Sequence, residues 1–117
     1  MHELSLCQAL IDQVEQIARE NEAVSVKAIW VQVGPLSGAE IPLLKHAYPV
    51  AASGSVAEDA ELFIERMPVR VRCRRCGAES EASANRLLCG QCGDYHTDLV
   101  SGDEMLLARL ELDKVTH

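Results

Sequence analysis

The stretches CRRCG (residues 73–77) and CGQCG (residues 89–93) decide how this chain of 117 residues folds. Two residues separate the cysteines of each pair, so a tight turn can direct both thiols at one ion. The glycine after each pair can adopt the positive φ that such a turn needs, and the turn can point backbone N–H groups at the thiolates. The spacing therefore predicts one metal site whose ligands are Cys73, Cys76, Cys89 and Cys92.

Zinc is the metal that this ligand set favours. Four thiolates form a closed tetrahedral shell with no position open to water, which is typical of structural zinc. Rubredoxin-type iron uses the same ligands, but the aromatic packing that we expect around iron is scarce in a chain with 3% aromatic residues. We therefore predict Zn²⁺ as a structural cofactor that stabilises a segment too short to build its own core, with iron as the less favoured alternative.

The composition restricts the class of protein. The net charge of −7 argues against a protein that binds nucleic acid through its overall charge. The apolar runs are shorter than the ~20 residues of a membrane span, and the first residues lack the pattern of a secretion signal. Four of the five cysteines form two tight pairs, which suits metal binding in a reducing compartment. We expect a cytoplasmic protein that binds neither nucleic acid nor membranes.

The rest of the chain predicts a small α+β domain around the cysteine module. The expected elements are a helix at 4–20, a strand at 24–33, a helix at 41–52, a strand at 60–67 that continues after a break at Pro68 to residue 71, and a strand at 106–113. The second helix should begin near Glu40, and Pro49 should kink or end it. We interpret Cys7, on the apolar stripe of the first helix, as a buried thiol rather than a ligand.

Two helices packed on a small three-stranded sheet are the simplest layered arrangement of these elements, with a zinc-ribbon-like module of four cysteines inserted before the last strand. We therefore predict a discontinuous α/β domain of residues 1–68 and 103–117, and a zinc module of residues 69–102. Both metal-ligating cysteine pairs lie within the second of these segments.

The first three residues, Met1-His2-Glu3, suggest a second kind of metal site. The α-amine, the amides of His2 and Glu3 and the imidazole of His2 can form a plane of four nitrogens, which Ni²⁺ and Cu²⁺ accept. Many chains begin Met-His by chance, so the alternative is a disordered tip ahead of a helix. The residues alone leave both interpretations open.

Several segments together resemble the HypA/HybF family of hydrogenase nickel-incorporation proteins. They are MHELSLC (1–7), GPLSGAE (34–40), GSVAEDA (54–60), the two cysteine pairs and the alternating last strand, in family order over nearly the whole chain. The resemblance implies a nickel metallochaperone for the maturation of [NiFe]-hydrogenase, not an enzyme. Ni²⁺ would be the cargo at the N-terminus, and structural zinc would bind the four cysteines.

The resemblance also implies roles for single residues and partners. His2 would be the essential nickel ligand, the Met1 amine and the amides of His2 and Glu3 would complete the plane, and Glu40 would lie nearby as an occasional ligand. The implied partners are the GTPase HypB, the hydrogenase large-subunit precursor and, in some organisms, urease maturation proteins, with the chain itself a monomer or weak homodimer. The chain departs from the family pattern at KHAYP (45–49), where we interpret His46 as a surface variation.

Two rival functions come from other classes. A zinc ribbon that binds nucleic acid could use the arginines between residues 70 and 75, although the metal site, formally dianionic, offers those arginines a partner of their own. The acidic net charge and the few aromatic residues count against this rival. A zinc enzyme is the second rival, and the sequence shows no open site with three ligands for it. We interpret His96, four residues after Cys92, as a surface histidine.

Overall fold

In the computed structural model, which describes residues 2–114, the chain forms two helices and six strands. These elements belong to two compact units. The first unit comprises Met1–Val31, Ala39–Glu65 and Leu106–His117, and the second comprises Gln32–Gly38 and Arg66–Met105. Two helices, two three-stranded sheets and a group of four cysteines confirm the predicted α+β class with an inserted cysteine module.

Helix α1 (His2–Glu20) is amphipathic and begins two residues earlier than predicted. Its apolar stripe is buried and consists of Cys7, Leu10, Ile11, Val14 and Ala18. Asn21 closes the helix, because its Nδ2 donates to the carbonyl of Ile17 at 2.8 Å. Glu22 then turns the chain with a left-handed φ of 57°. The prediction that Cys7 is a buried thiol is confirmed, because 1% of the residue is exposed.

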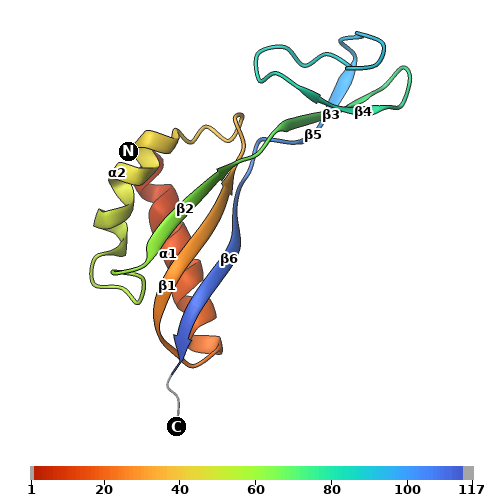
Figure 1. Cartoon of the computed structure of the whole chain (residues 1–117). Coiled ribbons are helices and arrows are strands. Elements are labelled where there is room, and N and C mark those ends of the chain that lie inside the picture. Colours follow the sequence, from red (N-terminus) through yellow and green to blue (C-terminus); the bar gives the residue numbers. More distant parts are fainter. Residues whose placement is uncertain (1, 115–117) are drawn as a thin grey trace. The chain divides into compact units, whose positions relative to one another are not determined.

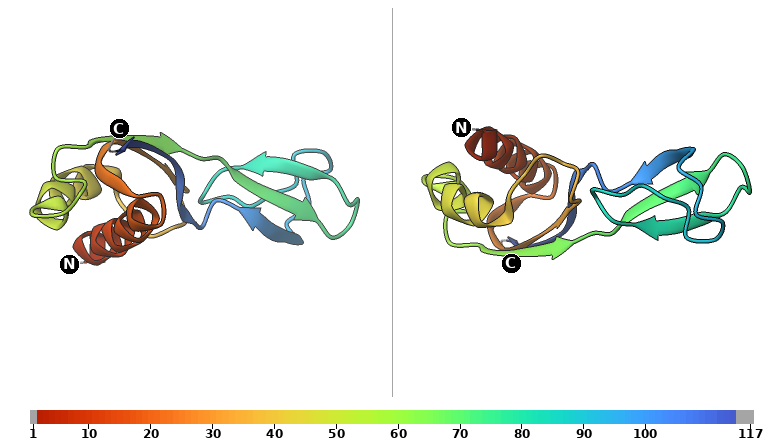
Figure 2. Two further views of the ribbon diagram at one scale, coloured as in Figure 1. Left: turned by 90° about the horizontal axis from the view of Figure 1, so that it is seen from below. Right: turned by 90° about the horizontal axis from the view of Figure 1, so that it is seen from above.

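The sheet of the first unit has the strand order β2-β1-β6. Its strands are β1 (Ala23–Val33), β2 (Glu61–Arg66) and β6 (Met105–Lys114). Both helices pack on the same face of this sheet (Figures 1 and 2). The central strand β1 is rich in β-branched residues, and Ile29 and Val31 in it are almost completely buried. Away from the core, Trp30 stacks on Phe63 with ring centroids 5.0 Å apart.

Helix α2 (Ile41–Ala52) begins directly after Glu40, as predicted, with a proline in its first turn. Pro49 lies inside the helix and does not end it. The proline removes the hydrogen bond to the carbonyl of Lys45, but both residues lie on the exposed side of the helix, where water can replace that bond. The opposite side buries Leu44 and Tyr48. The helix therefore tolerates the proline that was expected to kink or end it.

The two helices run side by side in the same direction, and this brings their N-terminal ends together. The thiol of Cys7 donates to the carbonyl of Leu44 at 3.6 Å. One turn earlier in each helix, the backbone N–H of Glu40 donates to Oε2 of Glu3 at 3.4 Å. Figure 2 shows the start of α1 beside α2. The first turn of α1 and the N-cap residue of α2, Glu40, therefore lie next to each other.

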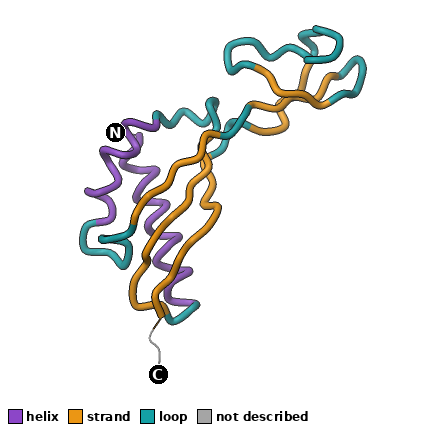
Figure 3. Tube along the Cα trace, in the orientation of Figure 1, coloured by secondary structure: helices purple, strands orange, loops and turns teal. Residues whose placement is uncertain are grey.

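The second unit contains strands β3 (Val69–Cys73), β4 (Glu79–Ala82) and β5 (Thr97–Ser101), with β3 in the centre and antiparallel to both neighbours. The prediction that the strand at 60–67 continues past Pro68 is wrong in one respect, because the segment after the proline belongs to this second sheet. Proline lacks the N–H that a continuous ladder requires. Figure 3 shows how much of this unit consists of loops.

The second unit also contains a close backbone contact between the segment after β1 and the segment before β6. The N–H of Gly34 donates to the carbonyl of Glu104 at 2.8 Å, and that of Leu36 donates to the carbonyl of Gly102 at 2.7 Å. A Cβ atom at Gly34 would collide with the backbone of Gly102, so only glycine fits there.

Neither helix in residues 2–114 has both the length and the apolar character needed to cross a bilayer.

Candidate metal sites

The two cysteine pairs form turns of nearly identical geometry. In the first turn the N–H of Gly77 donates to the carbonyl of Cys73 at 3.0 Å, and in the second the N–H of Gly93 donates to the carbonyl of Cys89 at 2.9 Å. Both glycines have φ of 78°, a value that favours glycine. The turn that the sequence predicted is therefore present twice.

Backbone N–H groups point at the first sulfur of each pair. The amides of Arg75 and Cys76 donate to Sγ of Cys73 at 3.3 and 3.4 Å. Gln91 and Cys92 donate to Sγ of Cys89 over the same two distances. The Cys92 amide, followed by the Gln91 amide, lowers the pKa of Cys89 to about 6. These bonds favour the thiolate, which is the form that binds a metal.

The four sulfur atoms converge on one point. The Sγ atoms of Cys73 and Cys92 are 3.6 Å apart, as are those of Cys76 and Cys89, and all four lie within 4.8 Å of one another. A disulfide would need about 2.05 Å. Zinc with four Zn–S bonds of about 2.3 Å at tetrahedral angles would place its sulfurs about 3.8 Å apart. The positions fit one four-coordinate metal ion.

Arginines near the cysteines bind carboxylates rather than the thiolates that we expected to be their partners. Arg74 pairs with Asp98 at 2.6 Å. Arg75 pairs with Asp94 at 3.1 Å. These pairs reduce the positive potential that a nucleic acid would meet, and this counts against the nucleic-acid rival. The pairing of β5 with β3 brings Asp98 close to Arg74, which residue spacing alone did not reveal.

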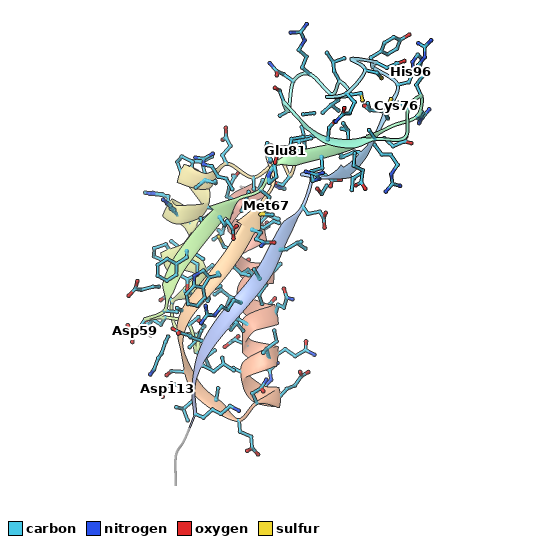
Figure 4. The ribbon with its side chains drawn as sticks, turned by 45° about the vertical axis from the view of Figure 1, so that its right-hand side comes forward. Asp59, Met67, Cys76, Glu81, His96 and Asp113 are labelled. Carbon is cyan, nitrogen blue, oxygen red and sulfur yellow. The ribbon has the colours of Figure 1, made fainter. Side chains whose placement is uncertain are left out.

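Asp94 is the best-bonded carboxylate beside the cysteine group. Its Oδ1 accepts the backbone N–H of His96 at 2.8 Å and contacts Nδ1 of the same residue at 2.7 Å. Only 7% of the Asp94 side chain is exposed, whereas His96 is 55% exposed at the surface, as predicted. The His96 amide, then its ring, then Arg75 lower the pKa of Asp94 to about 2. Figure 4 shows His96 and Cys76 in the loops of this unit.

Replacing Asp94 by alanine is expected to weaken metal binding at the cysteines about tenfold. Loss of a group that supports metal ligands typically lowers the metal affinity about 10–100-fold. The carbonyl of Asp94 accepts the N–H of Cys89 at 2.9 Å, so a shift of the backbone at Asp94 would also displace Cys89, one of the four cysteines. Competition between the protein and a chromophoric zinc chelator measures the effect. Asp98→Ala is the matched control, since it also removes a carboxylate paired with an arginine, but one whose side chain is 56% exposed.

The depressed pKa of Asp94 also fixes the sign of its pH dependence. An ordinary aspartate has a pKa of about 3.9, so the contribution of Asp94 to stability is complete above that pH. It disappears as the pH falls toward the folded value of about 2. Equal metal affinity of the Asp94→Ala and Asp98→Ala variants at neutral pH would contradict this role of Asp94.

The predicted nickel residues lie at the start of the first unit. His2 is exposed in the first turn of α1, and Glu3 and Glu40 are neighbours through the hydrogen bond described above. Met1 lies outside the described residues. The first N–H groups of a helix have no intrahelical acceptor, so the amides of His2 and Glu3 are not committed to the helix ladder. The structure thus brings Glu3 and Glu40 together beside these amides.

A family model described as hydrogenase/urease nickel incorporation metallochaperone, HypA, matches residues 1–112. The hydrogenase maturation factor HypA of Nitrosospira multiformis is 51% identical over 112 residues, which cover 96% of this chain and 97% of that protein. The factor of the same name from Aquifex aeolicus is 43% identical, over 97% and 98% of the two chains. This chain belongs to the HypA family. The predicted resemblance is confirmed.

Solved structures of HypA proteins share the fold. The solution structure of the Ni metallochaperone HypA from Helicobacter pylori has a TM-score of 0.75 and 26% sequence identity, and covers 97% of this chain and 98% of its own. A second HypA solution structure has a TM-score of 0.74 and 28% identity, with 96% of each chain covered. The HypA family consists of maturation factors for nickel incorporation, so the prediction that this chain is not an enzyme is confirmed.

Two features of these sites were missed at the level of sequence. One is the bonding of Asp94 to His96 and Arg75, whose only signal is an aspartate two residues after the last cysteine. The other is a groove between the helices, lined in part by Glu3 and His46. The apolar spacing of Leu43, Ala47 and Val50 could have indicated it, because these residues recur on one side of a helix.

Proposed function

We propose that this chain is a nickel metallochaperone that binds Ni²⁺ at its N-terminus and delivers it during the maturation of [NiFe]-hydrogenase. The observation that carries the proposal is the match to the HypA family model, which begins at residue 1 and includes the Met-His-Glu sequence. The nickel ligands that we propose are the Met1 amine, the amides of His2 and Glu3, and the imidazole of His2.

The helical start of α1 supports this ligand set. An α-helical ψ of about −42° keeps the backbone nitrogens of consecutive residues on the same side of the chain, whereas an extended ψ separates them. His2 is the first residue of α1, so its nitrogen and that of Glu3 can bind one ion with little rearrangement. Amide nitrogens that bind nickel lose their protons, and the positive end of the helix dipole stabilises the resulting negative charge.

Glu40 is proposed as an acidic neighbour and occasional ligand of the nickel ion. Its backbone N–H holds the carboxylate of Glu3, and its own side chain makes no capping hydrogen bond to α2. An exposed carboxylate at this position can offset the charge of an arriving cation. The supporting observation is therefore its position beside Glu3.

We further propose that the ion on the four cysteines is structural zinc. The sulfur spacing, the amides that support two thiolates and the absence of a fifth ligand in the described group support a closed site. In this division of the chain, residues 69–102 form the zinc module, which stabilises the fold and provides a recognition surface. Residues 1–68 and 103–117 form the domain that carries nickel.

The proposed setting is the cytoplasm, where zinc thiolates remain reduced. The proposed partners are the GTPase HypB, which would act in nickel loading, and the hydrogenase large-subunit precursor, which would receive the ion. Urease maturation proteins are a further proposed partner in organisms that contain urease. The chain would act as a monomer or weak homodimer and bind neither nucleic acid nor membranes.

A transfer experiment tests delivery. Tag-free protein loaded with one equivalent of nickel is mixed with the hydrogenase large-subunit precursor, and the nickel content of the precursor is measured after separation. We expect transfer from the loaded protein to exceed that from the same amount of nickel held by a small chelator of equal affinity. A variant with one glycine added before Met1 is the control, because it displaces the terminal amine from the chelate. Equal transfer from all three sources would remove the proposed function.

A further inference from the structure

A groove of about 390 Å³ lies between the two helices of the first unit. Its walls come from both helices and consist of Glu3, Leu4, Leu43, His46, Ala47 and Val50. Four of these side chains are apolar, so two side chains of the groove can bind a metal. The two are Glu3 and His46, one from each helix.

One residue of the proposed chelate, Glu3, lines the groove. Glu3 contributes an amide nitrogen to the proposed chelate and a side chain to the groove wall. The hydrogen bond between Glu40 and Glu3 holds the two helix ends together at this place. His46 lies on the side of α2 that carries Leu43 and Val50, which also line the groove. An imidazole on this wall therefore shares one space with a residue of the chelate.

The chemistry of nickel leaves room for such an imidazole. Four nitrogens in a plane leave the positions above and below the ion open. Neutral imidazole is the commonest protein ligand for ions of this kind, and an apolar surrounding limits competition from water. Added axial ligands favour the paramagnetic, higher-coordinate form of Ni²⁺ over the diamagnetic, square-planar form.

We propose that His46 is an additional ligand of the nickel ion, reaching it through the groove between α1 and α2. His46 is exposed at the surface, as the sequence-based interpretation has it, and the proposal gives this exposed imidazole a role. The inference rests on the proposed function, since it requires nickel at the N-terminal nitrogens. His46 would make the bound ion more than four-coordinate and hold it more tightly than the N-terminal nitrogens alone.

The test uses full-length, tag-free protein with one equivalent of Ni²⁺ at neutral pH. We measure its magnetic susceptibility by NMR and its ligand-field absorption. The wild-type protein is expected to hold paramagnetic nickel. The His46→Ala variant is expected to hold an equal amount of diamagnetic, square-planar nickel with about tenfold lower affinity. Lys45→Ala, at an exposed neighbouring position outside the groove, should behave as wild type.

The outcomes separate this inference from the proposed function. Square-planar nickel in the wild-type protein, or an unchanged spin state in His46→Ala, would overturn the role of His46. If His2→Ala loses nickel in the same experiment, the N-terminal site stands without His46. If His2→Ala keeps its nickel while His46→Ala loses it, the chelate is misplaced and both proposals fail. A paramagnetic wild type that turns square-planar only without His46 supports both.

Discussion

Replacing His2 by alanine is expected to lower the affinity of this chain for Ni²⁺ by more than about 100-fold, since even groups that only support a metal ligand are worth 10–100-fold. The imidazole is the one side-chain donor of the proposed plane, and without it the chelate loses a ring. Isothermal titration of nickel into tag-free protein measures the loss. The variant should keep its fold, because His2 is exposed at the start of α1.

His96→Ala is the matched control for this experiment. It also removes one exposed imidazole, but from the second unit, where His96 bonds Asp94. Nickel affinity should stay within the error of the wild-type value. Acidification should release nickel before zinc, because protons compete for the exposed nitrogen ligands, whereas two of the four proposed zinc thiolates are buried and supported by amides. Nickel uptake by His2→Ala equal to that of the wild type would exclude the N-terminal chelate.

The fold was predictable where local chemistry and packing require the same structure. The stripe of α1 repeats with helical spacing and packs as expected, and α2 begins at the expected residue because Glu40 and a proline mark its start. The path after Pro68 was not predictable in the same way. Alternation indicates a strand on both sides of the proline, but which sheet each strand joins depends on partners distant in sequence.

The cysteine site was predictable because its ligands are close in sequence and its turns need glycine at fixed positions. The contacts around the cysteine site and the groove between the helices were not predictable from the sequence. The bonds from Asp94 to Arg75 and His96 depend on how the two turns face each other, and the groove that holds His46 depends on the parallel run of two helices. Sequence spacing reports contacts within one element, whereas these contacts join residues from different elements.

Replacing Cys89 by serine is expected to release zinc and unfold the second unit. The second unit buries few apolar side chains, namely Val33, Val69 and Val71 together with two of the cysteines, Cys73 and Cys89. A core this small cannot offset the entropy of ordering the loops around it. Structural zinc contributes on the order of 10–16 kcal/mol in comparable small sites, as much as the whole stability of an ordinary domain. Zinc content and amide hydrogen exchange measure the two effects.

The first unit should survive this substitution, because α1 and β1 bury a core of their own that contains no zinc ligand. Amides of β3 are therefore expected to exchange rapidly in Cys89→Ser while those of α1 remain protected. Cys7→Ser is the matched control, since it makes the same atomic change at a buried thiol of α1 and should leave the zinc content unchanged. Protected β3 amides in a zinc-free Cys89→Ser protein would show that the three valines and the strand ladder suffice to hold the second unit together. In that case zinc would serve the surface of the module rather than its stability.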